Sequence, residues 1–255
     1  MKITFLGTGT SQGIPIICCG CKVCHSKNPK DQRLRTSIYI QKEDQSILID
    51  IGPDFRQQML TNGFQKVDAV LLTHQHADHT AGIDDIRPIY FNQRAEIPFY
   101  GEKMVLDDLR VRFGYIFGEN DYPGIPEVGL HEIYAGKEFG IGNTKILPLR
   151  IWHGQLPIVA FKIGSLAYIT DAKKIDQEVI QQLYGVDCLV INALRYKEHH
   201  SHLNMEECLQ IIKLINPKIT YIIHLSHQMG LHSEIESTLP DQVFLAYDGL
   251  SINVS

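Results

Sequence analysis

The chain has 255 residues and a formal net charge of −5; hydrophobic residues make up 44% of it and charged residues 21%. This composition is ordinary for a water-soluble globular protein, and the negative charge disfavours a broad nucleic-acid surface without excluding a local basic pocket. Because no run of about eighteen apolar residues occurs and Gly7 breaks the first apolar run early, we expect neither a membrane span nor a signal peptide. We therefore expect a cytoplasmic protein, in which the six cysteines are reduced thiols or metal ligands.

Alternating or continuous apolar runs predict strands, and apolar residues three to four positions apart predict helices. In the first half we expect strands over residues 1–7, 37–40, 46–50, 67–72 and 97–101, and helices over 54–62, 83–91 and 104–113. In the second half we expect strands over residues 144–149, 157–163, 166–169, 188–192 and 219–223, helices over 176–183 and 205–214, and then a short helix with one or two strands. The stretch Gly114 to Gly129 fits a lid, a dimer contact or a long loop. No linker-like stretch occurs, so we expect a single domain over residues 1–255 with sheets inside and helices outside.

Four potential metal ligands lie close together after the strand over residues 67–72, namely His74, His76, Asp78 and His79. A neutral imidazole binds metal ions, and a carboxylate is a hard anionic donor. The spacing of His74 and His76 fits extended backbone, which places both side chains on one face. Asp78 and His79 follow where the chain turns toward the helix that we expect to begin near Gly82. Two ligand pairs therefore diverge from one loop, as two adjacent metal ions would require.

Three more potential ligands, His153, Asp171 and His224, each follow a predicted strand. Ligands at the same end of neighbouring strands can converge in space although they are far apart in the sequence. Taken singly each is a weak signal, because a lone histidine after a strand is more often structural. Together with the four residues of the loop they complete a recurrent set.

This set resembles that of the metallo-β-lactamase superfamily, whose members share an αββα sandwich. The resemblance implies an α+β fold in which helices flank two mixed sheets, and a site for two divalent metal ions. The implied ligands are His74, His76 and His153 for one metal ion and Asp78, His79 and His224 for the other, with Asp171 bridging the two.

Two metal ions held in this way lower the pKa of a bridging water molecule, so that hydroxide is available near neutral pH. They also offset negative charge that develops on a phosphoryl or acyl oxygen. Imidazole with carboxylate suits Zn²⁺, Mn²⁺ or Fe²⁺, and the ligand set does not choose among them.

Cys19, Cys21 and Cys24 supply three of the four ligands that a tetrahedral zinc ion requires, and a thiol cluster without metal is the alternative. The spacing resembles that of the PhnP-type phosphodiesterases. This resemblance implies that His227 is the fourth ligand of a structural zinc ion, which would pin the N-terminal loop to the strand end that carries His224.

Several histidines precede the predicted helix over residues 205–214. The resemblance implies a catalytic histidine in this place, which we assign to His202, with His200 as the alternative. Such a residue would be the general acid that protonates the leaving oxygen. We name His202 and the metal ligand Asp78 as the catalytic residues.

Two arginines are candidate substrate contacts. Arg195 lies just upstream of these histidines, and Arg87 follows the metal-ligand loop. For Arg87 we favour a structural ion pair with Asp84 or Asp85, since such pairs are common.

The function that we expect is hydrolysis of a small or cyclic phosphodiester, similar to a phosphoribosyl 1,2-cyclic phosphate, by a metal-bridging hydroxide. The alternatives are RNA processing of the tRNase Z type, another metallo-hydrolase reaction on a thioester or a β-lactam, and a nucleotide-sensing metal-binding protein without catalysis. No insertion resembles an RNA-gripping arm, and the net charge disfavours an extended nucleic-acid partner. The resemblance also suggests a homodimer.

Overall fold

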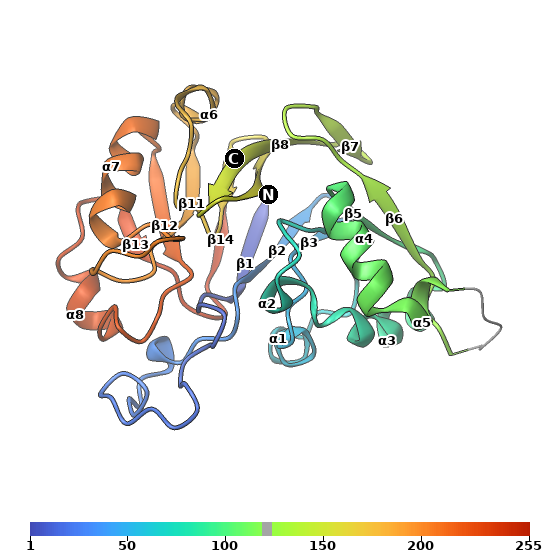
Figure 1. Ribbon diagram of the computed structural model, residues 1–255, viewed down its shortest axis with the longest axis horizontal. Helices are drawn as coiled ribbons and strands as arrows, with labels where there is room; N and C mark the ends of the chain where they lie inside the picture. The colour runs from blue at the N-terminus through green and yellow to red at the C-terminus, as the bar shows by residue number, and fades with distance from the viewer. Residues whose placement is uncertain (119–123) are drawn as a thin grey trace.

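Two mixed β-sheets lie face to face in the computed structural model, which describes residues 1–118 and 124–255 (Figure 1). Within these residues the first sheet has the order β14 (Ser251–Asn253), β1 (Lys2–Gly7), β2 (Ser37–Lys42), β3 (Gln45–Ile49), β4 (Ala69–Leu71), β5 (Ile97–Gly101) and β6 (Val128–Glu132). The second has the order β13 (Val243–Leu245), β12 (Ile219–Ile223), β11 (Cys188–Asn192), β10 (Leu166–Ile169), β9 (Leu156–Ile163), β8 (Thr144–His153) and β7 (Phe139–Ile141). Strands β3 to β6 and β10 to β13 run parallel within their sheets, whereas the remaining pairs are antiparallel.

Helices cover the outer face of each sheet. The first sheet carries α1 (Phe55–Asn62), α3 (Arg87–Gln93) and α4 (Lys103–Arg112), and the second carries α6 (Gln177–Leu183), α7 (Met205–Ile215) and α8 (His232–Glu236). Shorter turns of helix are η1 (Pro29–Asp31), α2 (Ala77–Thr80), η2 (Ile83–Ile86) and α5 (Gly114–Phe117).

Three apolar layers hold these elements together. The middle layer packs side chains such as Ile40 and Phe161 between the sheets, and the two outer layers pack each sheet against its helices. Burial on this scale stabilises by roughly 25 cal/mol for each Å² of apolar surface removed from water. The predicted αββα sandwich is confirmed.

Local signals explain some helix ends and not others. Helix α1 ends at Gly63, whose φ of 68° suits glycine, as the sequence predicts. At the N-terminal end of α1 the side chain of Asp54 makes no capping bond, because its carboxylate accepts the backbone N–H and the guanidinium of Arg35 instead. Helix α7 begins with a capping box, in which Asn204 and Glu207 each accept the other's backbone N–H.

The helix expected over residues 83–91 is present as η2 and α3, and a separate turn of helix, α2, precedes it and includes Asp78 and His79. A single turn of helix is too short for a periodic signal, which is why the sequence does not predict α2. The stretch from Gly114 to Gly129 contains α5 and the start of β6, and its middle lies outside the described residues. No helix in residues 1–118 and 124–255 is both long enough and apolar enough to cross a membrane.

Candidate metal centre and catalytic site

Strand ends from both sheets meet at one edge of the sandwich. His153 is the last residue of β8, His224 follows β12 directly, and Asp171 comes just after β10. The loop that begins at Thr73 leaves β4 toward the same place. Asp171 and His224 both have a φ of 56°, a left-handed conformation that non-glycine residues adopt where the surroundings impose it, often at functional sites.

The structure brings all seven predicted active-site ligands together in two adjoining groups. Within each group the ligand atoms lie within 4.8 Å of one another. The groups are His74, His76 and His153, and Asp78, His79, Asp171 and His224.

Asp171 lies at the centre of the second group. One carboxylate oxygen is 3.2 Å from Nε2 of His224, and the other is 3.2 Å from Nε2 of His79. Asp171 also forms a third group with His153 and His202. This carboxylate therefore faces ligands of both proposed metal ions, as its predicted bridging role requires.

The hydrogen bonding of the ligand nitrogens, like their spacing, fits the binding of metal ions. Nε2 of His74, His79 and His224 is buried and has no hydrogen-bond partner among the described residues. Buried polar atoms are normally satisfied, so several imidazole nitrogens without a partner that face carboxylates fit a cation-binding site.

The electrostatics of the side chains alone keep His74 and Asp171 in ligand-competent forms. Burial, with the neighbouring charge of His79, lowers the pKa of His74 well below its ordinary value, so this imidazole stays neutral. Burial alone would raise the pKa of Asp171, but His224 and His79 outweigh it and hold that pKa well below the ordinary range. A neutral imidazole and an ionised carboxylate are the forms that bind metals. Burial would lower the pKa of His79, but the carboxylates of Asp78, Asp171 and Asp50 outweigh it and raise that pKa well above its ordinary value, so a metal ion would displace a proton from this imidazole.

Asp50, which follows β3, supports a proposed ligand and is not among the residues predicted from the sequence. It is fully buried, and its carboxylate accepts hydrogen bonds from the backbone N–H and the hydroxyl of Thr73 at 2.8–3.1 Å. The carboxylate also lies 2.7 Å from Nδ1 of His79, so that Nε2 points at the other ligands. The sequence feature that could have revealed it is an acidic residue at the end of the predicted strand 46–50, at the sheet edge that carries His74.

In two further ligands an oxygen atom likewise lies within hydrogen-bond distance of Nδ1. Nδ1 of His153 lies 2.8 Å from the carbonyl oxygen of Ser201, and Nδ1 of His74 lies 3.0 Å from the hydroxyl of Thr73. Such partners select the tautomer that leaves Nε2 free for a metal ion.

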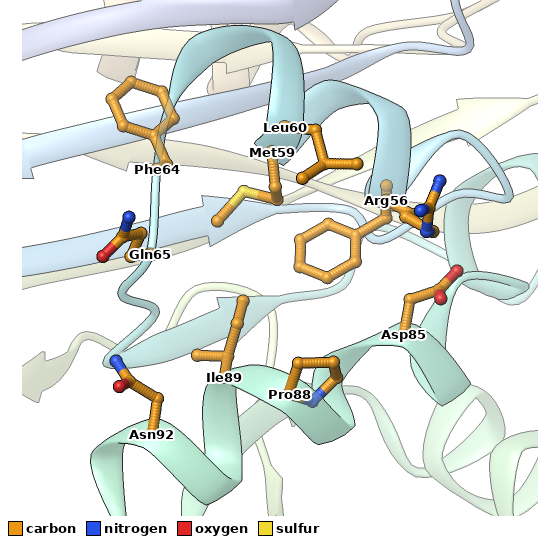
Figure 2. Close-up of a pocket in the computed structure, with 10 residues that line it drawn as sticks. Arg56, Met59, Leu60, Phe64, Gln65, Asp85, Pro88, Ile89 and Asn92 are labelled. Atoms are coloured by element: carbon orange, nitrogen blue, oxygen red, sulfur yellow. The ribbon is translucent and has the colours of Figure 1, made fainter.

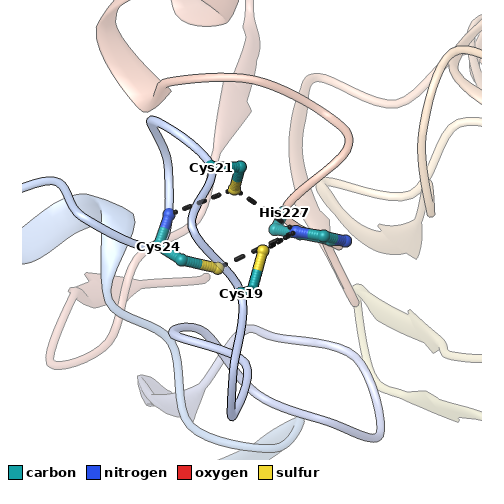
Figure 3. A group of neighbouring side chains, drawn as sticks. All are labelled: Cys19, Cys21, Cys24 and His227. Carbon is teal, nitrogen blue, oxygen red and sulfur yellow. Dashed lines mark hydrogen bonds between the residues drawn. The ribbon is translucent and has the colours of Figure 1, made fainter.

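The three cysteines and His227 also converge, as Figure 3 shows. Sγ of Cys19, Cys21 and Cys24 lies 3.2, 3.4 and 3.8 Å from Nδ1 of His227. A hydrogen bond from the backbone N–H of Cys24 lowers the pKa of the Cys21 thiol to about 6, and the thiolate is the form that binds zinc. Cys18 is exposed and stays outside this group.

Backbone hydrogen bonds place the loop that carries Cys19, Cys21 and Cys24, here called the cysteine loop, beside the metal centre. Leu225, next to His224, donates its N–H to the carbonyl oxygen of Thr8 and accepts the N–H of Thr10, at 3.0 and 3.1 Å. The start of the N-terminal loop is thereby tied to the end of β12 (Figure 1).

A polar cavity of about 240 Å³ lies between the cysteine loop and the metal centre. Its walls come from residues 10–16, 194–202 and 226–228, and His202 is one of them. The ring of His202 lies 4.9 Å from that of His224 and 4.5 Å from that of His153, centroid to centroid. His200 is exposed, stacks on His199 and is not among the residues that line this cavity.

The two candidate arginines occupy different places. Arg195 lines the polar cavity, where its guanidinium donates to Oε1 of Gln228 at 2.6 Å and to the carbonyl oxygen of Lys197 at 3.2 Å. Arg87 forms an ion pair with Asp84 at 2.8 Å, the structural role favoured above, and does not border the cavity.

A second cavity, of about 460 Å³, lies between α1 and α3 on the outer side of the first sheet (Figure 2). Its walls are mainly apolar, with Met59, Pro88 and Ile89 among them. Neither His202 nor His227, which line the polar cavity, borders this second cavity, so we do not include it in the site.

Comparison with known proteins agrees with this geometry. The beta-lactamase superfamily domain matches residues 45–225. A protein of Porphyromonas gingivalis named octanoyltransferase is 44% identical over 252 residues, which are 98% of this chain and 51% of that protein, so the chain spans about half of it. Ribonuclease Z of Archaeoglobus fulgidus is 29% identical over 157 residues, which are 60% of this chain and 44% of that protein.

Among solved structures, the crystal structure of a diphosphatase from the PhnP family is 37% identical to this chain. It superposes with a TM-score of 0.92 over 98% of this chain and 96% of that one. We conclude that the chain belongs to the beta-lactamase superfamily and has the metallo-β-lactamase fold.

Proposed function

We propose that this protein is a phosphodiesterase that hydrolyses a small or cyclic phosphodiester with two divalent metal ions, Zn²⁺, Mn²⁺ or Fe²⁺. The observation that carries the proposal is the convergence of seven ligands with His202 beside one small polar cavity. The likeness to a PhnP-family diphosphatase supports it.

The proposed ligands are the two groups described above, with Asp171 between them. When bound there, the metal ions would activate water and offset negative charge on the phosphoryl oxygens. The chain itself supplies the position of each ligand. Asp50 holds His79, the carbonyl oxygen of Ser201 holds His153, and the left-handed backbone at Asp171 and His224 turns both side chains into the site.

We propose that His202 donates a proton to the leaving oxygen. It is nine-tenths buried, borders the cavity and faces the proposed metal centre. Burial, with the nearby His224, lowers the pKa of His202 to about 2, so its imidazole is neutral in the free chain. A bound phosphodiester is an anion, which favours the protonated form of an adjacent imidazole.

We propose a structural zinc ion on Cys19, Cys21, Cys24 and His227. A closed set of four ligands leaves no position for substrate. Because Ile16 from the cysteine loop and His227 itself line the polar cavity, this zinc ion would hold one wall of the substrate pocket.

The small size of the cavity is one reason to favour a small phosphodiester over RNA as the proposed substrate. A space of about 240 Å³ admits only a small group, whereas structured RNA requires an extended basic surface. We infer that the acyl transfer in the octanoyltransferase name belongs to the part of that protein beyond this chain, since histidine and aspartate ligands suit metal-assisted hydrolysis.

Turnover assays test the proposal. Protein loaded with Zn²⁺ or Mn²⁺ should hydrolyse bis(p-nitrophenyl) phosphate and a ribose cyclic phosphate, and protein stripped with a chelator should not. Failure of the loaded protein on both substrates would refute the phosphodiesterase. Preferential cleavage of a structured RNA precursor would favour the ribonuclease Z function instead.

A further inference from the structure

We propose that Arg112 is a positioning residue that holds the metal-ligand loop in place, an inference that rests on the metal centre proposed above. Arg112 is the last residue of α4, and its Nη2 donates to the carbonyl oxygen of Gln75 at 3.0 Å and to Oγ1 of Thr80 at 2.8 Å. One guanidinium nitrogen therefore bridges both ends of the segment that carries His76, Asp78 and His79.

The contact with Thr80 reaches His76 through one more hydrogen bond. Oγ1 of Thr80 donates to the carbonyl oxygen of His76 at 2.8 Å while it accepts the bond from Arg112. A hydrogen bond from a cation polarises the hydroxyl and strengthens the bond that the hydroxyl donates. Arg112 thereby acts on the backbone of a ligand that it does not touch.

His76 is a ligand of this loop whose ring lacks such support. The rings of His74, His79 and His153 each have a partner on Nδ1, whereas the ring of His76, like that of His224, has no hydrogen-bond partner among the described residues. His76 is also solvent-exposed. Its placement therefore depends on its backbone, which Thr80 and Arg112 hold.

The guanidinium is itself held by a rigid element. Nε of Arg112 donates to the carboxylate of Asp108 one turn earlier at 2.6 Å, and α4 packs against the first sheet through the buried Leu109. Arg110 on the same helix pairs with Asp107 and makes no contact with the loop, so it provides a matched control.

Loss of such an outer partner typically weakens metal binding 10–100-fold. For Arg112→Ala we expect roughly tenfold weaker binding at one metal position, since Arg112 acts on His76 indirectly. Arg112→Lys should fall between Ala and wild type, because one ammonium group does not reproduce the planar fork that serves Asp108, Gln75 and Thr80 together.

Titration with Zn²⁺ against a chromophoric chelator tests the inference without any substrate. We expect one class of zinc site to be weakened in Arg112→Ala and unchanged in Arg110→Ala, while metal-free Arg112→Ala and Arg110→Ala unfold at similar temperatures. Thr80→Val should weaken the same site, and the double variant with Arg112→Ala should lose less than the sum of the two single losses.

Two results would overturn the inference. If Arg112→Ala and Arg112→Lys bind zinc as tightly as Arg110→Ala, the proposed metal centre stands and Arg112 does not position it. If metal-free Arg112→Ala unfolds at a much lower temperature while every zinc site weakens in parallel, Arg112 is a general stabilising residue. A wild-type chain that binds no zinc beyond the cysteine site would overturn both this inference and the proposed function.

Discussion

The substitution Asp50→Asn isolates the role of the buried carboxylate behind His79. In the wild type Oδ1 of Asp50 accepts the backbone N–H of Thr73, and Oδ2 lies 2.7 Å from Nδ1 of His79, while the hydroxyl of Thr73 lies within 3.1 Å of both oxygens. Asparagine keeps the shape but replaces one acceptor with an NH₂ donor. The outcome depends on which side receives the new donor.

The hydrogen bonds decide the orientation. An NH₂ group facing the backbone N–H of Thr73, 2.9 Å from the present oxygen, would set donor against donor and leave a buried N–H unsatisfied, at about 1–3 kcal/mol. An NH₂ group facing His79 avoids this penalty, because the imidazole can move its proton from Nδ1 to Nε2. That tautomer points a proton at Asp78 and Asp171 and removes the nitrogen that would bind metal.

We therefore expect Asp50→Asn to fold but to bind metal weakly. The expected loss is about 10–100-fold in affinity at the position that His79 serves, or about 1.4–2.8 kcal/mol. Zinc stoichiometry after desalting and chelator competition measure the loss, and circular dichroism checks the fold. Asp68→Asn is the control, since Asp68 accepts the backbone N–H of Ser46 at the other end of β3. Wild-type zinc affinity in folded Asp50→Asn would refute the tautomer argument.

Three further predictions concern other parts of the site and the fold. His202→Ala should reduce turnover of bis(p-nitrophenyl) phosphate about 10²–10⁴-fold with unchanged metal content, whereas His200→Ala should retain near wild-type turnover; the reverse pattern would assign the proton donor to His200. Cys21→Ser should remove about one zinc ion per chain in elemental analysis while the active-site metals stay, and unchanged zinc content would exclude the structural site. Burial raises the pKa of Asp248 to about 6. Between about pH 4 and 6 this carboxyl is protonated in the folded chain and ionised in the unfolded chain, so the folded chain loses stability as pH rises through that window. The free energy of unfolding of wild type relative to Asp248→Asn should fall by about 3 kcal/mol there, and parallel urea-unfolding profiles would contradict this reasoning.

The sequence was informative where ligands are close together or follow clear strands. The loop with His74 and His76 holds four ligands within six residues, and each distant ligand directly follows an apolar run. Parallel strands β10 to β12 bring their ends to one edge, so a local pattern predicts a tertiary site. The cysteine cluster with His227 was predictable from the resemblance, and the backbone pairing of Thr8 and Thr10 with Leu225 explains why these distant residues meet.

The supporting contacts were not predictable in the same way. Asp50 and Thr73 are separated by 23 residues, and Arg112 and Thr80 by 32, so each pairing depends on how helices and strands pack. A sequence pattern reports which face a residue occupies but not which atom it meets across a packed interface. For Arg87 the alternatives of ion pair and substrate contact stayed open until the structure showed the bond to Asp84.

The metal-ligand loop is held from two sides, and this arrangement explains how it can be in place before a metal ion binds. Asp50 reaches it from the buried side through Thr73 and His79, and Arg112 reaches it from the exposed side. The two anchors come from different elements, the end of β3 and the end of α4, so the loop cannot shift without breaking one of them. Several imidazoles and two carboxylates held close together would otherwise favour an open, hydrated loop, because desolvation is costly without the cation. We infer that this double anchoring keeps the ligands together during metal exchange, with the exposed anchor on His76 the weaker of the two.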